Sequence, residues 1–377
     1  MISLDKEQLC FLELIKASIF DFTPVFPESV NWDKVFELAK AQCVVPLLLS
    51  CVPAEHKNDW LGIACQSKAH YVQMLFEQNS LIRLLNTNLI PFFIFKGTAA
   101  AIYYPAPYLR SFGDIDFYVP DEYFDSVMRL LDCNGYIYIE NNDRHYEYKK
   151  NGIVFELHNR ISRKGIFEID PIILNDLNSV VECSINSFCF PCLPTYKNGL
   201  ILLWHIAHHL KGTGLGFRQF IDWMMFVQKE LDDLSWEMHF KTLAKEAGLE
   251  KLAITVTFMC KKWLGLSREI SWCNSADEDV ADQILIRVLD DCNFGCERAP
   301  AESVNETIKK EGLFKYFQHA GIVNWSLARK YPVFRPFAWL YQSFRFAYKG
   351  VLGIIKGKKV FRKRQNIPLE DLWERLE

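Results

Sequence analysis

The sequence has no uninterrupted apolar run that approaches the roughly 18 residues of a membrane-spanning helix. It also has no secretory signal at its start, because residues 1–7 carry acidic side chains and no long apolar region. The twelve cysteines are scattered along the chain. We therefore expect a cytoplasmic protein whose cysteines are reduced thiols.

Paired metal-binding cysteines are absent as well. Cys189 and Cys192 have the CxxC spacing of a zinc motif, but the other close pair, Cys292 and Cys296, has a different spacing and lies far along the chain. Zinc motifs of this kind are specific only when two such pairs occur together. The sequence therefore does not predict a cysteine-bound zinc ion.

A strong excess of charge of one sign is also missing, since the formal net charge is −3. This balance argues against a protein that binds nucleic acid through bulk charge alone. The charge is uneven, however, because residues 345–364 contain eight Lys or Arg and no acid. This basic tail could lie on an anionic surface or nucleic acid, or pack against the acidic remainder of the chain.

The composition is that of a soluble globular protein. The chain has 377 residues, of which 50% are hydrophobic and 24% charged, so it can bury a large core. Residues 1–90 and 196–377 carry apolar side chains mainly at helical spacing. Residues 91–195 alternate short strand-like runs with turns and helices. We expect an α+β protein with an α/β core between helical N- and C-terminal regions.

A short apolar run at residues 91–95 leads directly into Lys96-Gly97-Thr98 and then into a helix-forming stretch from Ala99. A strand that turns through glycine into a helix presents free backbone N–H groups, which suit a phosphate. An ordinary strand-to-helix turn would show the same pattern. The turn gains interest because two carboxylates follow it.

Asp114 and Asp116 flank Ile115 in a stretch that continues through Phe117 to Val119. On a strand, the alternation of side chains sends both carboxylates to one face and the apolar residues to the other. Two like charges this close repel, and a divalent metal or a shared proton usually offsets the repulsion. The stretch therefore predicts a cation site backed by a core.

Arg110 stands just before these carboxylates, in a loop whose prolines prevent the preceding helix from continuing. Two roles are open for it. It could pair with one of the carboxylates and structure the loop, or it could reach a ligand phosphate with two hydrogen bonds.

Residues 145–158 show the pattern of a β-hairpin with Asn-Gly as its two-residue turn. Such a turn sets the register, which places Glu147 opposite Glu156 and His145 opposite His158. Two glutamates opposite one another are destabilising unless a cation or a proton intervenes. This polar face either meets solvent or looks at the same metal as the two aspartates.

A later helix carries His205, His208 and His209, whose spacing places them on one face. They could bind zinc, contact a nucleotide or serve the structure alone. Arg218 and Asp222 follow at a spacing of four residues, where a structural ion pair is the favoured interpretation.

Four short motifs follow one another between residues 90 and 165: Lys96-Gly97-Thr98, Tyr104-Pro105, Arg110-x-x-Gly-Asp-Ile-Asp116 and Glu156-Leu-His158-x-Arg160. Together they resemble the uncharacterised nucleotidyltransferase family, within the DNA polymerase β-like nucleotidyltransferase superfamily. The resemblance extends more loosely through the helical part to Asp222. It implies a small mixed or antiparallel sheet flanked by helices.

The resemblance implies that Asp114, Asp116 and Glu156 are the metal-binding and catalytic carboxylates. The hairpin register keeps Glu147 as the alternative third carboxylate. The expected contacts to nucleotide and phosphate are Lys96, Gly97, Thr98 and Arg110. The residues expected near the substrate are Glu147, His158, Arg160 and His209.

The implied reaction transfers a nucleoside monophosphate from a nucleoside triphosphate to a hydroxyl of a small-molecule or protein acceptor. Mg²⁺ or Mn²⁺ is the expected cofactor, because two divalent ions can stabilise both the attacking and the leaving oxygen. Asp116 or Glu156 could take the proton of the hydroxyl. The alternatives are a glycosyltransferase with an Asp-x-Asp metal site and a non-catalytic module that binds nucleotide or RNA.

Overall fold

The computed structural model describes residues 4–20, 23–141, 145–162, 167–211, 215–266, 269–290, 369–376 and scattered residues between 312 and 345. Cys292, Cys296 and nearly all of the basic tail lie outside the described residues, and so do the expectations attached to them. The chain divides into two compact units. One consists of residues 1–295 and 367–377, and the other of residues 296–366.

In the described part of the chain, seven strands form one mixed sheet in the order β3-β4-β5-β2-β1-β7-β6. The strands are β1 Phe93–Phe95, β2 Asp114–Tyr118, β3 Ile137–Asn141, β4 His145–Lys150, β5 Ile153–His158, β6 Val181–Ile185 and β7 Phe188–Cys192. β2 is parallel to β5 and antiparallel to β1, while β1 is parallel to β7. The predicted α+β fold with a mixed sheet between helical regions is confirmed.

The β4–β5 hairpin has the predicted register. Glu147 pairs with Glu156, and His145 pairs with His158. The turn residues have positive φ angles of 49° at Asn151 and 85° at Gly152, as a two-residue type I′ turn requires.

Helices surround the sheet. Before it come α1 Lys6–Phe20, α2 Trp32–Ala41, α3 Val45–Leu48 and α4 Lys57–Thr87. Among the strands lie α5 Gly97–Ala101, α6 Asp121–Cys133 and α7 Asp170–Ile173. After the sheet come α8 Thr195–Lys211, α9 Phe217–Glu230, α10 Asp233–Ser235, the π-helix η5 Trp236–Phe240, α11 Lys241–Glu246, α12 Glu250–Leu264, α13 Glu278–Asp290 and α18 Leu369–Leu376.

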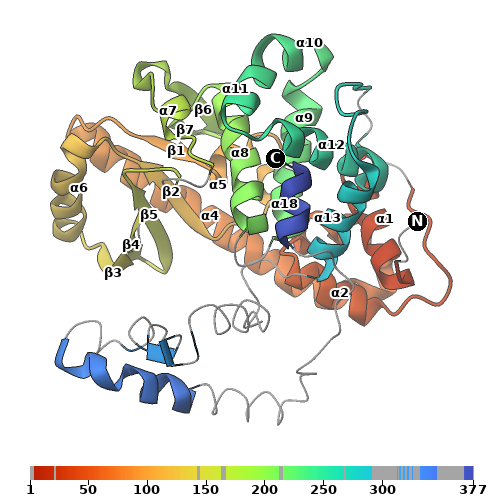
Figure 1. The fold of residues 1–377 in the computed structure, drawn as a ribbon, viewed down its shortest axis with the longest axis horizontal. Helices are drawn as coiled ribbons and strands as arrows, with labels where there is room; N and C mark the ends of the chain where they lie inside the picture. The colour runs from red at the N-terminus through yellow and green to blue at the C-terminus, as the bar shows by residue number, and fades with distance from the viewer. Residues whose placement is uncertain are drawn as a thin grey trace. The chain divides into compact units, whose positions relative to one another are not determined.

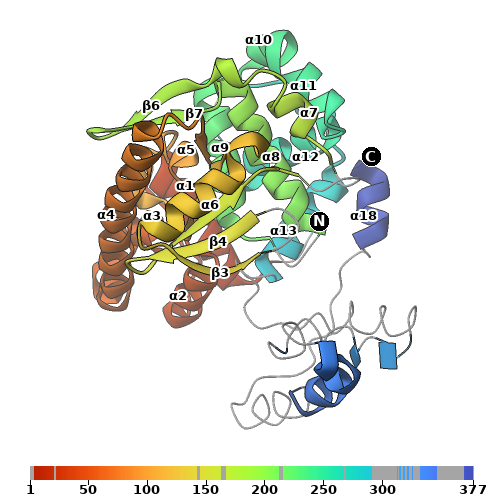
Figure 2. The same cartoon turned by 90° about the vertical axis from the view of Figure 1, so that its left-hand side faces the viewer.

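The two faces of the sheet pack against different helices. Ile115 and Phe117 join apolar side chains of α4 and α6 in one buried cluster. Phe93 and Phe95, whose side chains point to the opposite face, join a larger cluster that includes α8, α9 and α12. Figure 1 shows the sheet with α6 on its left and the layer of later helices on its right, and Figure 2 shows the same arrangement turned by 90°. The polar side chains of the sheet therefore lie on the face turned toward the later helices.

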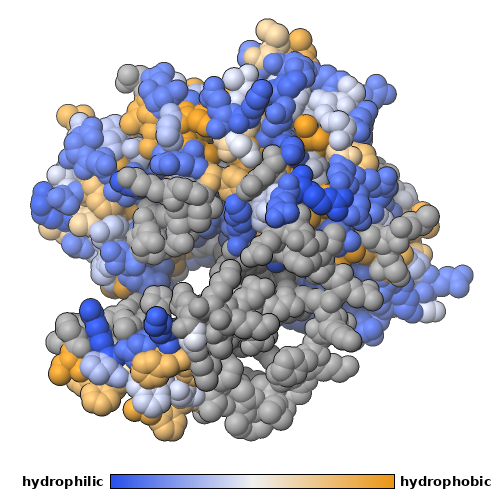
Figure 3. All heavy atoms as spheres, in the orientation of Figure 1, coloured by the Kyte–Doolittle hydropathy of each residue, from blue (hydrophilic) through white to orange (hydrophobic). Residues whose placement is uncertain are grey.

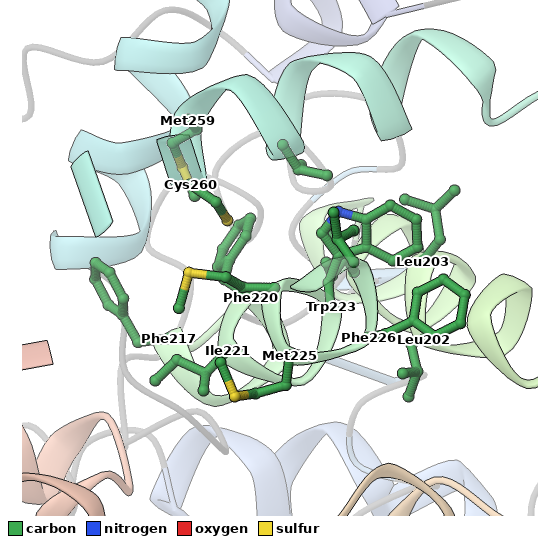
Figure 4. Packing of buried hydrophobic residues seen from close by; sticks show 14 of the residues in the cluster. Leu202, Leu203, Phe217, Phe220, Ile221, Trp223, Met225, Phe226, Met259 and Cys260 are labelled. Carbon is green, nitrogen blue, oxygen red and sulfur yellow. The ribbon is translucent and has the colours of Figure 1, made fainter. Parts of the chain in front are cut away.

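The larger cluster is centred on α9, which is buried from Phe217 through Val227. Figure 4 shows its side chains among residues of α8 and α12. α8 and α9 approach closely at Gly199, where an added Cβ would overlap the ring of Phe226. α9 thus lies at the centre of the core, and it carries the buried polar residues Arg218, Gln219 and Asp222 among its apolar side chains.

The described surface seen from the side of Figure 1 is mainly hydrophilic, with smaller apolar patches between the polar side chains (Figure 3). None of the described helices is both long and apolar enough to cross a membrane.

The second unit contains the 3-10 helix η6, Pro332–Phe337. The ring of Trp325 stacks on Tyr341 with centroids 5.3 Å apart. Phe314 packs against Trp339 at 5.7 Å. Aromatic contacts therefore link the described residues of this unit.

We expect Gly199→Ala to lower the free energy of unfolding by about 1–3 kcal/mol, because the added methyl group would overlap Phe226 in a packed core. The control is Gly62→Ala on α4, where nothing lies within 4 Å of the added methyl group. That change should raise stability by roughly 0.5–1 kcal/mol, because Ala favours a helix over Gly. Urea unfolding followed by circular dichroism measures the free energy of unfolding of both variants. An equal loss of stability in Gly62→Ala and Gly199→Ala would contradict the close approach of α8 and α9.

Candidate active site

The polar face of the sheet is built by the neighbouring parallel strands β2 and β5. Their register places Asp116 beside Glu156 and Tyr118 beside His158. Because side chains alternate along a strand, Asp114 lies on the same face as Asp116. Ile115, which lies between them, belongs to the apolar cluster behind the sheet, so the core orients the carboxylates.

The carboxylates of Asp114, Asp116 and Glu156 meet on this face. Each offers an oxygen that lies within 4.8 Å of those of the other two. The Lys96 ammonium donates to Asp116 Oδ1 at 2.7 Å, where Asp116 is only 2% exposed. Negative charge that is this buried needs compensation. The oxygen donors fit Mg²⁺ or Mn²⁺, which would supply the missing positive charge.

The two aspartates respond to this crowding in opposite directions. Burial, with the charges of Asp116 and Glu156, raises the pKa of Asp114 to about 7. Burial would also raise the pKa of Asp116, but the Lys96 ammonium and the His158 imidazole hold it well below its usual range. Nearby positive charge therefore compensates the Asp116 carboxylate but not the Asp114 carboxylate.

Two histidines flank Glu156. His158 Nε2 lies 3.1 Å from Asp116 Oδ1 and 3.2 Å from Glu156 Oε2. On the other side, His145 Nε2 lies 3.4 Å from Glu156 Oε1. The ring of His158 is fully buried and meets the edge of Phe95 at a centroid distance of 4.9 Å. Packing and hydrogen bonds thus hold His158 in place.

The Lys96-Gly97-Thr98 turn lies beside the start of β2. Lys96 has a φ of 53° and Gly97 a φ of 20°, and no side chain caps the first turn of α5. A Cβ added at Gly97 would lie 3.5 Å from the carbonyl oxygen of Asp114. Thr98 Oγ1 donates to Gln78 Oε1 at 2.8 Å in a buried contact with α4. The Thr98 hydroxyl hydrogen therefore anchors the turn to α4.

Arg110 pairs with Asp222 on α9. Its Nε and Nη2 donate to the two carboxylate oxygens at 2.8 Å each, and the Tyr104 hydroxyl donates to Asp222 Oδ1 at 2.8 Å. The sequence favours a pair between Arg218 and Asp222. The charge of Asp222 does act on Arg218, whose Nη1 donates to the Ser111 carbonyl oxygen at 3.2 Å. Arg110 and Asp222 lie 112 residues apart, so no local spacing signals their contact.

The remaining predicted residues lie around this centre. Glu147 is half-buried and faces both Glu156 and Glu140 across neighbouring strands. Burial, followed by the charges of these two glutamates, raises the pKa of Glu147. It is not a member of the three-carboxylate group. The Arg160 side chain is exposed, whereas its carbonyl oxygen contacts His158.

α8 presents histidines to the site. His205 is buried, and its pKa is lowered well below the usual range by burial and then by His209, Lys96 and Arg218. His209 Nε2 lies 2.8 Å from His205 Nε2. Helix α5, which begins directly after Lys96, packs against α8, so α8 lies beside the Lys96 turn.

The model of a family described as uncharacterised nucleotidyltransferase matches residues 28–265. Among solved structures, the chain is similar to a solution structure of the antibiotic-resistance factor ANT(2'')-Ia, described as revealing substrate-regulated conformation dynamics. The two sequences are 12% identical, and the TM-score is 0.36. The alignment covers 48% of this chain and 96% of that chain. A crystal structure of ANT(2'')-Ia in complex with adenylyl-2''-tobramycin is 14% identical with a TM-score of 0.35, and covers 45% of this chain and 98% of that chain. No curated protein matches this chain.

We expect Asp222→Ala to lower the free energy of unfolding by about 3–5 kcal/mol, because it leaves the buried Arg110 guanidinium without its partner. The double variant Arg110→Met with Asp222→Leu should recover part of that loss, because the Arg110 charge is no longer buried while the Tyr104 hydroxyl still loses its acceptor. Denaturant unfolding measures both.

The matched control is Glu37→Gln, which removes the exposed Lys40–Glu37 pair of α2 and should cost less than about 1 kcal/mol. If Asp222→Ala lowered the free energy of unfolding by no more than this control does, the buried Arg110–Asp222 pair would not be what holds the loop.

Proposed function

The chain belongs to the uncharacterised nucleotidyltransferase family, and we propose that it transfers a nucleoside monophosphate from a nucleoside triphosphate to a hydroxyl group with Mg²⁺ or Mn²⁺. The observation that carries this proposal is the meeting of three carboxylates beside a strand-to-helix turn that carries Lys96. The acceptor is a hydroxyl of a small molecule or of a protein.

Asp114 and Asp116 are the bridging carboxylates in this proposal, and Glu156 is the third. The choice of Glu156 over Glu147 rests on strand order, because β5 lies next to β2 whereas β4 is one strand further away. Bound divalent ions would stabilise the attacking and leaving oxygens of an in-line displacement at the α-phosphate. The three side chains would hold them by oxygen ligands.

Lys96 and the first backbone N–H groups of α5 are the proposed contacts to the triphosphate. Gly97 supports the turn because its φ of 20° places it in a region that favours glycine, and because a Cβ there would lie 3.5 Å from the Asp114 carbonyl oxygen. Thr98 and Arg110 are bonded to Gln78 and Asp222. We therefore assign to these two residues the task of holding the turn and the following loop in place.

Proton transfer from the acceptor hydroxyl falls to Glu156 in this proposal. Both carboxylates already have contacts, Asp116 Oδ1 with Lys96 and His158 and the Glu156 oxygens with His145 and His158. Exposure distinguishes them, because the Asp116 side chain is only 2% exposed. Glu156 keeps 16% of its side chain exposed and can meet an incoming hydroxyl. His158 and Glu147 lie beside it on the same face, and the Arg160 carbonyl oxygen contacts His158.

The acceptor approaches along α8 in this proposal. His209 is half-buried, in contact with His205, and on the helix that packs against α5 beside the Lys96 turn. The transfer site belongs to the α/β core of residues 91–195, and the helical region that follows supplies one wall.

We expect incubation with labelled nucleoside triphosphates, Mg²⁺ or Mn²⁺ and a cell extract to yield pyrophosphate and a labelled acceptor. Asp114→Asn and Asp116→Asn should each reduce the rate on the order of 100-fold or more, because a centre that stabilises transition-state charge is lost. The control is Glu140→Gln, which removes a carboxylate on the same row of the sheet at an exposed edge strand.

Glu140→Gln should leave the rate nearly unchanged. Nucleoside diphosphate released from a sugar nucleotide, with no pyrophosphate from any triphosphate, would overturn the proposal in favour of glycosyl transfer. Binding of nucleotide without any turnover would instead support a non-catalytic module.

A further inference from the structure

We propose that His145, Glu156 and His158 form a second metal site, which takes a transition-metal cation such as Zn²⁺ and shares Glu156 with the three-carboxylate site. The inference goes beyond the proposed function, since that function requires only cations with oxygen ligands. It rests on the geometry of the hairpin and on the hydrogen bond made by His158.

The hairpin brings the three side chains together. His145 and His158 are directly opposite one another on β4 and β5, with ring centroids 5.0 Å apart. The two carboxylate oxygens of Glu156 face the two imidazoles, at 3.4 Å from His145 Nε2 and 3.2 Å from His158 Nε2. One ligand atom from each residue lies within 4.8 Å of the others. A cation between these atoms would replace the contacts that they now make with each other.

The orientation of His158 is that of a metal ligand. Its Nδ1 lies 3.3 Å from the Arg160 carbonyl oxygen, which can only accept a hydrogen bond, so Nδ1 carries a hydrogen. The other ring nitrogen, Nε2, faces the carboxylate oxygens of Glu156 and Asp116 at 3.2 and 3.1 Å. Metal-bound histidines commonly donate their other ring N–H to a backbone carbonyl in this way.

The donor set selects the kind of cation. Imidazole nitrogens suit Zn²⁺ and other transition metals, whereas Mg²⁺ prefers oxygen. Two histidines and one glutamate leave a coordination position for water or substrate, as in catalytic zinc sites. His158 and His145 are buried, while Glu156 is partly exposed, so the site is sheltered on the protein side and accessible from the substrate side.

Filling this site would change the carboxylate site as well. His158 Nε2 now contacts Asp116 Oδ1, and it would leave that oxygen when it ligates a metal. Asp116 would then be freer to bind the cation of the three-carboxylate group. The two sites are therefore coupled through His158 and through the shared Glu156.

The test is titration of the metal-free full-length chain with Co²⁺ in the absence of nucleotide, followed by visible absorption. Co²⁺ is a spectroscopic substitute for Zn²⁺, and we expect a spectrum of nitrogen and oxygen ligands that millimolar Mg²⁺ does not remove. His145→Gln and His158→Gln should each raise the dissociation constant at least about 10-fold, since even supporting groups of metal sites have effects of this size. Competition with Zn²⁺ should abolish the spectrum.

Two controls separate this site from its neighbours. Asp114→Asn removes a carboxylate of the oxygen site and should keep the Co²⁺ spectrum. His239→Gln removes an exposed histidine that stacks on Tyr196 and should leave the affinity unchanged. Unfolding curves establish that the variants fold, and if His158→Gln does not fold, His145→Gln carries the test.

Equal Co²⁺ affinity in the wild type, His145→Gln and His158→Gln would overturn the inference, and so would loss of the spectrum in Asp114→Asn. Because no nucleotide is present, this outcome is independent of the proposed transfer reaction. A histidine-dependent spectrum in a chain without transfer activity would support the metal site and reject the proposed function alone.

Discussion

Negative charge gathered on one face of β2 and β5 is the constraint on which the rest of the site depends. Asp114, Asp116 and Glu156 cannot all remain ionised in so buried a place unless positive charge lies among them. Lys96 and His158 both reach Asp116, which explains why its pKa falls while that of Asp114 rises. The negative charge that remains would favour a bound cation.

The surrounding fold keeps these charges from moving apart. Behind the strands, the apolar cluster with α4 and α6 prevents β2 from rotating its carboxylates away. In front, the loop before β2 is bound to α9 through Arg110 and Asp222, and the turn is bound to α4 through Thr98 and Gln78. Burial of hydrogen-bonded polar groups orients a site even where it adds little net stability.

Much of the carboxylate face could be predicted from the sequence because its causes are local. Alternation along residues 114–119 separates carboxylates from core, and Asn151-Gly152 sets the register of the hairpin. The choice between Glu156 and Glu147 could not be made this way, since both lie on one face and only the order of strands distinguishes them.

Long-range partners could not be predicted for a different reason. A residue such as Arg110 suits a phosphate and a buried carboxylate equally well, and a single sequence does not say which of the two it meets. The Thr98 hydroxyl is similarly ambiguous. Its partner Gln78 lies on a helix whose packing against the turn is a tertiary property. Local chemistry thus identified the polar residues but not their partners.

The spacing of a sheet explains why Glu156 belongs to both ligand groups. Neighbouring strands lie about 4.8 Å apart, and residues two apart along a strand are separated by roughly 6.6–6.8 Å. Side chains at such neighbouring positions can reach one another. Glu156 lies beside Asp116 of β2, and its two carboxylate oxygens lie 3.4 Å from His145 Nε2 and 3.2 Å from His158 Nε2. A cation held by the histidines would therefore draw on the same carboxylate that completes the oxygen site, so neither site could be filled without affecting the other.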